Sequence, residues 1–230
     1  MSLNRFENFV IDNKVIGFFD EAITLKSGRK SHFYVNWREP TYDAFLLDQL
    51  SNYISDYLIN SEIEFDSLYG VPEGASKVAI VSALKIAQKS SNFQKGSHVI
   101  PMGRAKPKLH GKAEDKFFIG KPKGRVVVLE DTITTGMSLL ETLDKLKEAG
   151  VEVVAALALT DRMELRDNGL SVREEIQKRY DGKIAYHAMS EADKLLPASL
   201  KQSAPSPSVL NSLKTEFEKY GVKPLNLEVN

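Results

Sequence analysis

Residues 126–138 have the sequence VVVLEDTITTGMS, and this stretch indicates the fold. Its first four residues are apolar on both faces, as in a parallel strand that helices cover on each side. Two acids and a turn rich in hydroxyl groups follow, and the apolar period then predicts a helix that Gly150 ends. A buried strand that leads through such a turn into a helix is typical of an open α/β sheet.

Strands and helices alternate on both sides of this stretch. Helical apolar spacing predicts helices at residues 3–13, 40–58, 75–89, 137–149, 171–180 and 209–220. Short runs of β-type residues predict strands at residues 32–36, 66–69, 97–102, 125–129, 151–159 and 183–187. The alternation predicts a doubly wound, mostly parallel and twisted sheet flanked by helices.

Composition excludes several classes of protein and site. The chain has 230 residues, of which 42% are hydrophobic, and this is enough for a folded core. Its 31 basic and 31 acidic residues cancel, so we expect no nucleic-acid partner. There is no cysteine, which excludes disulfides, and the four histidines are scattered, which argues against a zinc site.

The sequence contains no stretch that is suited to membrane insertion. Residues 1–14 lack the apolar core of a signal peptide. No apolar run approaches the roughly 18 residues that a membrane span needs. We therefore expect a cytoplasmic protein without a membrane partner.

The turn after the apolar strand has the chemistry of a site for a phosphorylated ribose. Free backbone amides and the helix dipole favour a phosphate at the helix start, and three threonine hydroxyls add donors. Gly136 lets the backbone approach phosphate oxygens closely. Glu130 and Asp131 repel a phosphate, but they can accept hydrogen bonds from ribose hydroxyls.

Other interpretations of this turn are weaker. An isolated acid before a helix most often only caps the helix, but here a strand, two acids and the string TxTTG occur together. The chain contains neither GxxxxGK[ST] nor GxGxxG, which excludes the usual triphosphate and dinucleotide loops.

A second candidate for function is the segment 103–123, which has no apolar period. It holds seven basic residues against two acidic ones, and three glycines that permit movement. Long aperiodic segments inside a compact domain are usually functional lids or disordered. The segment could be only a solvated basic loop. Because it comes just before the strand at 125–129, which leads into the predicted phosphate-binding turn (the phosphate turn, 132–136), we favour a lid that excludes water and neutralises a leaving group.

Four blocks of the sequence resemble known motifs. VVVLEDTITTGMS resembles the diphosphoribosyl-binding motif of type I phosphoribosyltransferases. LKSGRKSHFYVN (25–36), RAKPKLHG (104–111) and ALTDRME (158–164) are similar to segments of the orotate phosphoribosyltransferases. The blocks occur in that family's order and cover about residues 26–166, which is most of the chain.

This resemblance implies a type I phosphoribosyltransferase fold with a small N-terminal hood. We expect residues 1–230 to form a single domain, with 1–40 as the hood on the base side and 198–208 as a linker to a C-terminal helix at 209–220. The implied reaction transfers ribose 5-phosphate from 5-phosphoribosyl 1-diphosphate to orotate, in pyrimidine biosynthesis. It needs Mg2+, which substrate oxygens hold, with no direct protein ligand. The implied assembly is a homodimer that shares the loop 103–123 in trans.

The resemblance also implies roles for individual residues. The catalytic residues it implies are Lys26, Lys108, His110 and Asp131. Those it implies for 5-phosphoribosyl 1-diphosphate are Lys26, Arg104, Lys108, His110, Glu130, Asp131, Thr132, Ile133, Thr134, Thr135, Gly136, Met137 and Ser138. Those it implies for orotate are Lys26, Tyr34, Thr134 and Arg162, the last pairing with the orotate carboxylate.

The sequence departs from the family pattern at several positions. Ala105 replaces a lysine of the lid, with Lys106 beside it, and Glu73-Gly74 stands where many members have tyrosine and lysine. Glu130 replaces the more usual aspartate. Two alternatives stay open: a phosphoribosyltransferase for uracil or a purine, or a non-catalytic regulator that binds nucleic acid. The LKSGR block with Arg162 favours a carboxylated pyrimidine, and the presence of Lys108 with zero net charge disfavours the regulator.

Overall fold

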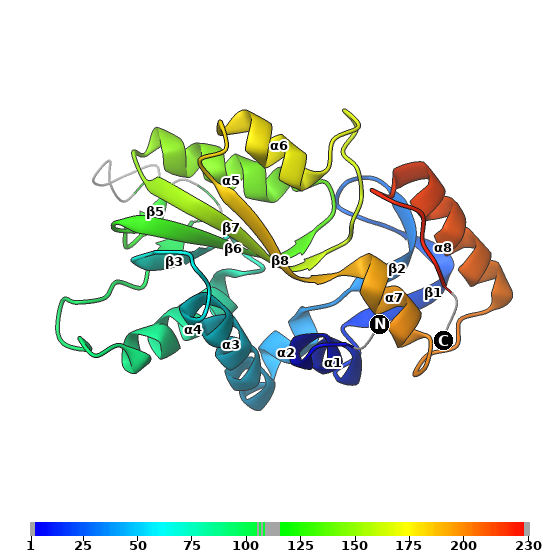
Figure 1. Ribbon diagram of the computed structural model, residues 1–230, viewed down its shortest axis with the longest axis horizontal. Coiled ribbons are helices and arrows are strands. Elements are labelled where there is room, and N and C mark those ends of the chain that lie inside the picture. Colours follow the sequence, from blue (N-terminus) through cyan, green and yellow to red (C-terminus); the bar gives the residue numbers. More distant parts are fainter. Residues whose placement is uncertain (1–2, 105, 107, 109–115, 228–230) are drawn as a thin grey trace.

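A four-stranded parallel sheet forms the centre of the computed structural model, which describes residues 3–104, 106, 108 and 116–227 (Figure 1). The strand order is β3, β6, β7, β8, and neighbouring strands pair in parallel. The strands span Ser67–Gly70 (β3), Arg125–Ile133 (β6), Glu152–Asp161 (β7) and Ala185–Glu191 (β8). This arrangement confirms the predicted parallel α/β sheet.

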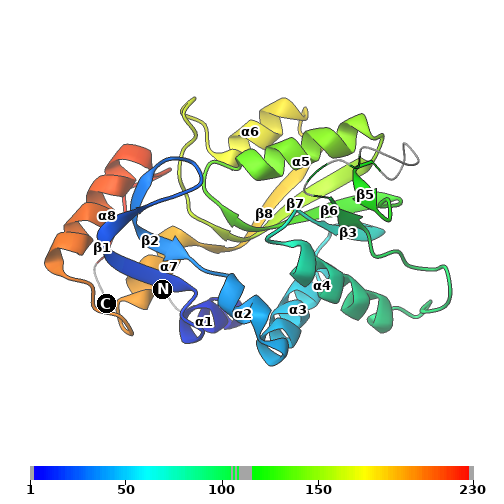
Figure 2. The same cartoon turned by 180° about the vertical axis from the view of Figure 1, so that it is seen from behind.

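Helices cover both faces of the sheet (Figure 1, Figure 2). Helices α5 and α6 lie on one face, and α1, α3, α4 and α7 lie on the other. They span Met137–Glu148 (α5), Val172–Arg179 (α6), Arg5–Asp12 (α1), Ala44–Ile59 (α3), Ser76–Lys89 (α4) and Ala192–Ser199 (α7). In β6, Val126 and Val128 pack with α5 and α6, whereas Val127 and Leu129 pack in the opposite cluster. Burial on both faces explains why this strand is apolar throughout.

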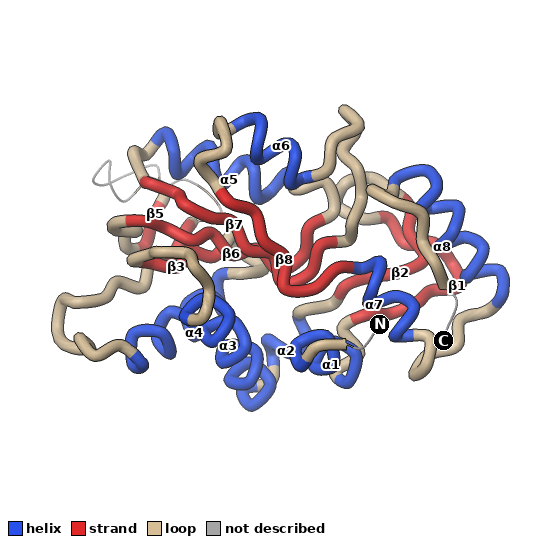
Figure 3. Tube along the Cα trace, in the orientation of Figure 1, coloured by secondary structure: helices blue, strands red, loops and turns tan. Residues whose placement is uncertain are grey.

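A hairpin and the C-terminal helix lie side by side at one end of the molecule (Figure 3). The hairpin consists of antiparallel strands β1 (Ile16–Thr24) and β2 (Lys30–Val35). Helix α8 (Pro207–Tyr220) covers it, and the rings of Phe33 and Phe217 stack with their centroids 6.1 Å apart. The N-terminal segment is thus stabilised by residues from the far end of the chain. The number of domains stays a prediction.

The helix expected at 40–58 is divided in two. Helix α2 (Arg38–Tyr42) ends before Asp43, whose backbone is extended, and α3 begins after it. The Asp43 side chain accepts a hydrogen bond from the Leu46 amide at 2.8 Å and so caps α3. The division places the start of α2 beside the pocket described below.

The strand expected at 97–102 is mostly absent. Only β4 (Met102–Gly103) is paired, with β5 (Phe118–Ile119). Pro101 has no amide hydrogen, so the ladder begins only after it. Strand β1 and helix α7 are further elements that the sequence patterns did not predict.

Among the described residues, no helix combines the length and apolar character that crossing a membrane requires. The expected cytoplasmic location stays a prediction.

Candidate active site

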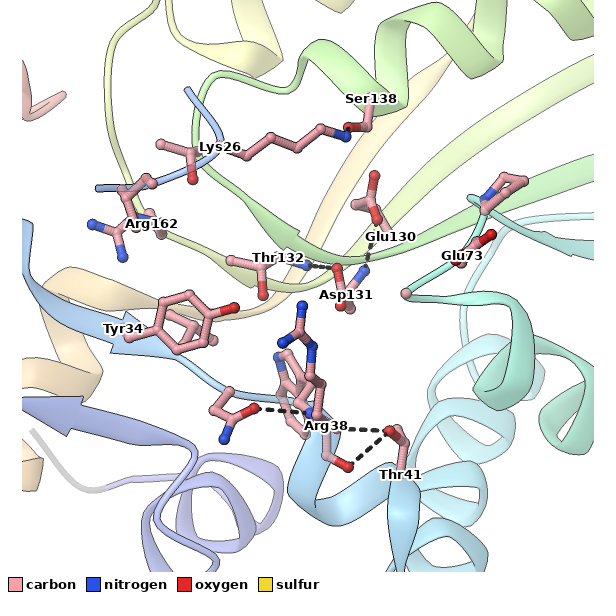
Figure 4. Close-up of a pocket in the computed structure, with 17 residues that line it drawn as sticks. Lys26, Tyr34, Arg38, Thr41, Glu73, Glu130, Asp131, Thr132, Ser138 and Arg162 are labelled. Carbon is pink, nitrogen blue, oxygen red and sulfur yellow. Dashed lines mark hydrogen bonds between the residues drawn. The ribbon is translucent and has the colours of Figure 1, made fainter. Parts of the chain in front are cut away.

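A pocket lies beyond the C-terminal ends of β6 and β7, where open α/β sheets bind their ligands (Figure 4). The residues that line it come from the hood, α2, the β3–α4 turn and β6. They are Leu25, Lys26, Tyr34, Val35, Asn36, Trp37, Arg38, Thr41, Pro72, Glu73, Gly74, Glu130, Asp131, Thr132, Thr134, Ser138 and Arg162. The structure therefore brings together residues that were predicted for both substrates.

The turn that follows β6 forms a smaller pocket beside the first one. It is lined by Lys26, Ser27, Glu130, Thr132, Ile133, Thr134, Thr135, Gly136, Met137 and Ser138. Gly136 has a φ of +68°, and a Cβ there would lie 2.7 Å from a methyl group of Val172, so only glycine fits. The Lys26 ammonium donates to Ser138 Oγ at 2.9 Å and joins the hood to the start of α5.

Two further side chains lie against this turn, and the sequence patterns missed both. Arg166 donates a hydrogen bond to the carbonyl oxygen of Thr135 and holds the turn from outside. Ser27 Oγ is buried and has no hydrogen-bond partner among the residues that the structure describes. A buried hydroxyl without a partner is unfavourable, so a ligand oxygen in this pocket would satisfy it. For Ser27, the sequence offered one signal, which is that its hydroxyl follows Lys26 directly in the LKSGR block.

Both acids lie on the last residues of β6 rather than in the following turn, because β6 stays paired with β7 beyond them. The Asp131 amide donates to Glu130 Oε1 at 3.3 Å, and the Thr132 amide donates to Asp131 Oδ1 at 2.7 Å. Burial raises the pKa of the Glu130 carboxyl well above its ordinary value, and repulsion from Asp131 adds to this. Burial also raises the pKa of Asp131. The pocket therefore holds two acids close together at its centre.

Gly74 makes room for one of these acids. A Cβ at Gly74 would lie 2.6 Å from Asp131 Oδ2, so a larger residue would displace the carboxylate. Gly74, at a position where the family pattern has a larger residue, therefore leaves the space that the Asp131 carboxylate occupies. The neighbouring Glu73 also lines this pocket and adds a third acid to it.

We expect the Glu130→Gln variant to be more stable than the wild type at pH 8, by a few degrees in Tm. The folded chain keeps the Glu130 proton above the carboxyl's ordinary pKa, so the free energy of unfolding falls as pH rises from about 4.5 through the raised pKa. The side-chain amide of the glutamine variant does not titrate, so it adds no such pH dependence to the free energy of unfolding. The Tm difference between variant and wild type should therefore be small near pH 4.5 and grow towards pH 8. Exposed Glu218→Gln is the control; a difference that stays constant with pH would contradict the prediction.

The end of the pocket where the base is predicted to bind, called the base end below, contains Tyr34, Trp37 and Arg162. Tyr34 is half-buried and faces the cavity in Figure 4. Trp37 is buried, and its Nε1 donates to Thr160 Oγ1 at 3.1 Å. Trp37 was given no role from the sequence. An aromatic wall of this kind suits a flat heterocyclic base.

The Arg162 guanidinium is engaged with protein groups. Its Nε donates to Glu164 Oε1 at 2.8 Å, and one terminal nitrogen donates to the Phe33 carbonyl at 3.2 Å. The other terminal nitrogen donates to Ser31 Oγ at 2.9 Å and Glu216 Oε1 at 3.2 Å. Only 1% of the side chain is exposed. The role implied for Arg162 towards orotate stays a prediction.

The basic segment begins and ends as a narrow hairpin. The Arg104 amide donates to the Phe117 carbonyl at 2.9 Å, and the Lys108 amide donates to the Lys116 carbonyl at 2.8 Å. Arg104 lines a neighbouring pocket together with Lys26. Lys108 is exposed and lies outside these pockets, and His110 lies outside the described residues. The structure thus connects Arg104 with the site, whereas the roles of Lys108 and His110 stay predictions.

Solved structures with a similar fold place the chain in a class. The orotate phosphoribosyltransferase of Francisella tularensis is 21% identical with a TM-score of 0.68, covering 95% of this chain and 100% of that one. The UMP synthase of Leishmania donovani is 21% identical with a TM-score of 0.70, covering 93% of this chain and 42% of that one. Adenine phosphoribosyltransferase of Leishmania tarentolae is 13% identical with a TM-score of 0.55, covering 83% of this chain and 88% of that one. The fold is that of a type I phosphoribosyltransferase.

Sequence relatives narrow the class to a family. The orotate phosphoribosyltransferase of Polynucleobacter necessarius is 31% identical over 170 residues, which cover 74% of this chain and 72% of the relative. That of Polynucleobacter asymbioticus is 32% identical over 162 residues, which cover 70% and 68%. No protein-family model matches the sequence. The chain belongs to the orotate phosphoribosyltransferase family. Members of this family are pentosyltransferases of pyrimidine biosynthesis. This membership confirms the predicted fold class, family and enzyme class.

Proposed function

We propose that this pocket transfers ribose 5-phosphate from 5-phosphoribosyl 1-diphosphate to orotate, giving orotidine 5′-monophosphate and diphosphate. The observation that carries the proposal is the continuity of the pocket from the phosphate turn, past the two acids, to the aromatic wall. In this arrangement the 5-phosphate binds at Thr134–Ser138, the ribose hydroxyls at Glu130 and Asp131, and the base at Tyr34. The Mycobacterium tuberculosis enzyme, 21% identical with a TM-score of 0.53, has been solved in complex with the same diphosphate.

The chemistry requires the control of charge and of water. The bond from the anomeric carbon to the diphosphate oxygen breaks, and a bond from that carbon to a ring nitrogen of orotate forms. Negative charge grows on the departing diphosphate, and positive charge grows on the ribose ring. The negative charge on the diphosphate is neutralised by Lys26, Arg104 and Lys108. The positive charge on the ribose ring is stabilised by the carboxylates of Glu130 and Asp131. The hairpin lid excludes water, which would otherwise hydrolyse the activated sugar.

The residues of the pocket fit a magnesium ion that the substrate brings. Magnesium in such sites takes one or two carboxylates together with phosphate oxygens and water. Glu130 and Asp131 supply hard oxygen donors at the pocket centre, and the described residues contain no group of three or more ligands that would hold the ion alone. When bound, the ion would neutralise part of the diphosphate charge. Substrate oxygens are therefore its main ligands in the proposed function.

Purified protein with Mg2+ and 5-phosphoribosyl 1-diphosphate is expected to consume orotate. The measurement is the loss of orotate absorbance, with uracil, adenine and hypoxanthine as alternative bases. The aromatic wall accepts any flat base, so these controls test the substrate assignment itself. Turnover of one of these bases without turnover of orotate would overturn the proposed substrate and leave the phosphoribosyl site standing.

We further propose a homodimer in which the lid of one subunit completes the site of the other. Large apolar side chains lie exposed at the end of α2 and the start of α3, with Tyr42 89% and Phe45 68% accessible, as is typical of a surface that a partner covers. The lid residue Lys108 lies outside the pocket of its own chain. Both observations support a shared site.

A mixed dimer of Lys108→Ala and Asp131→Asn subunits is expected to recover activity that neither variant has alone. If the lid acts in trans, one of its two sites combines an intact Asp131 with an intact Lys108. Co-expression with two affinity tags isolates the mixed dimer, which should show about half of the wild-type turnover. A mixed dimer as inactive as its parents would show that each subunit uses its own lid.

A further inference from the structure

Glu216 of α8 is a buried acid behind the base end of the pocket. Its Oε1 accepts a hydrogen bond from Arg162 Nη2 at 3.2 Å, although the two residues lie 54 positions apart in the chain. Its Oε2 accepts from the His32 amide of β2 at 3.3 Å. Only 9% of Glu216 is exposed. One carboxylate of the C-terminal helix therefore joins the residue directly after β7 to the second strand of the hood.

A charged carboxylate is unfavourable at this depth unless its neighbours hold it. Burial raises the pKa of Glu216, because the surroundings favour the neutral form. Ser31, the charge of Arg162 and the His32 amide lower the pKa in turn. All three belong to β2 or to the end of β7, so the acid is stabilised by the same elements that it connects.

The two elements that Glu216 connects carry the residues of the base end. Tyr34 lies on the same strand as His32, and Arg162 follows β7. Figure 4 shows Tyr34 and Arg162 on the same side of the pocket. The Arg162 guanidinium also lies over the Phe33 ring, with Cζ 3.7 Å from the ring centroid. The aromatic wall and the guanidinium thus share one support.

The chain that follows α8 holds the segment after Arg162 through its backbone. Gly221 pairs with Glu164 in an antiparallel bridge, and the Val222 amide donates to the Met163 carbonyl at 2.8 Å. Glu164 in turn accepts from Arg162 Nε at 2.8 Å. These backbone contacts fix the chain beside the guanidinium, whereas α8 supplies a side chain that contacts the guanidinium itself.

Glu216 reaches a ligand only through Arg162. It lines a separate groove between the hood and α8, whereas Arg162 lines the pocket. An arginine binds a carboxylate well in a narrow range of orientations, because its N–H groups form a rigid planar fork. A tilt of the guanidinium would therefore weaken the hold on a carboxylate of the base more than the hold on the rest of a nucleotide.

We propose that Glu216 is a positioning residue for the base, which holds Arg162 in the orientation that a carboxylated pyrimidine requires. The C-terminal helix is then part of the selection of the base, although it lies outside the sequence blocks that resemble the family. The proposal rests on the proposed function and on the predicted role of Arg162 towards the base carboxylate.

The test compares two nucleotides that differ only in this carboxylate, orotidine 5′-monophosphate and uridine 5′-monophosphate. Calorimetry gives the affinity of each for the wild type, Glu216→Gln and the control Glu218→Gln, which changes an exposed glutamate of the same helix. A glutamine can accept from Arg162 or from His32, but it turns an N–H group towards the other. We expect Glu216→Gln to lose about tenfold of the wild-type preference for the carboxylated nucleotide. Its affinity for uridine 5′-monophosphate should stay within about twofold, and in turnover KM for orotate should rise without KM for 5-phosphoribosyl 1-diphosphate.

A double variant separates positioning from a general loss of structure. Arg162→Lys keeps a positive charge opposite the two glutamates but removes the planar fork. It should lower the preference by itself. Adding Glu216→Gln should then change the preference by less than about twofold, because a single flexible ammonium needs no fixed orientation. Glu218→Gln added to Arg162→Lys is the matched control.

Three outcomes would overturn the role of Glu216. Wild-type preference and KM values in Glu216→Gln would leave this acid a structural role alone. A stronger preference would show that Glu216 competes with the ligand for Arg162. A full tenfold loss in the Arg162→Lys background would show that it acts without Arg162. A wild type that shows no preference and no turnover of orotate would instead contradict the proposed function itself.

Discussion

The Asp131→Asn variant is expected to lose about two to three orders of magnitude in kcat/KM for phosphoribosyl transfer. Asp131 is the half-buried acid at the centre of the pocket, where the proposed function places the ribose. Positive charge develops on the ribose ring as the diphosphate leaves, and a neutral amide cannot stabilise it. The substitution preserves shape, so the change removes charge and little else.

The structure explains why the fold should survive this substitution. The Thr132 amide donates to Asp131 Oδ1 at 2.7 Å, and an asparagine carbonyl can accept the same hydrogen bond. The pKa of Asp131 is raised by burial, so the loss of its charge should not lower the free energy of unfolding. Steady-state kinetics with a parallel thermal melt separate the two effects. The control is Asp181→Asn, which changes an exposed aspartate outside the pocket. If Asp131→Asn kept the kinetics of the wild type, the Asp131 carboxylate would have no part in the mechanism.

Lys108→Ala is expected to lower kcat by about two to three orders of magnitude while leaving the melting temperature unchanged. Its ammonium is exposed, and the backbone of the hairpin rather than this side chain holds the lid, through the Lys108 amide and the Lys116 carbonyl. A cation that meets the diphosphate only when the lid closes acts on the transition state more than on the ground state. The effect should therefore appear in kcat more than in KM.

The choice of control decides how the Lys108 result is interpreted. Lys95→Ala removes an exposed lysine outside the lid and leaves the hairpin intact. Lys106→Ala, in the same hairpin, shows whether that residue replaces the lysine missing at Ala105. A Lys108→Ala rate equal to that of Lys95→Ala would exclude this lysine from the proposed mechanism.

Much of the fold and half of the site follow from local sequence. The string VVVL predicts a strand buried on both faces, because a parallel strand covered by helices places successive apolar side chains in two separate core clusters. The turn at 134–136 is readable from the sequence through its hydroxyl groups and Gly136, although Arg166 and Val172 from a later part of the chain also contact it. The divided helix at Asp43 was not predictable from apolar spacing, because that spacing marks the buried face of α3 and not the residue at which the helix begins.

Sequence alone therefore indicated the parallel sheet, through the alternation of strands and helices, and the turn at 134–136 with the acid pair before it, through their local residue pattern. Only the tertiary structure decided the base end. There Arg162, directly after β7, meets Glu216 of α8, 54 residues later in the chain, and the pair forms only because the C-terminal helix packs against the hood. Together with the hydrogen bonds to Phe33 and Ser31, that contact joins the end of β7 to the hood and to α8. The surroundings of Arg162 thus depend on long-range packing, which sequence motifs do not record.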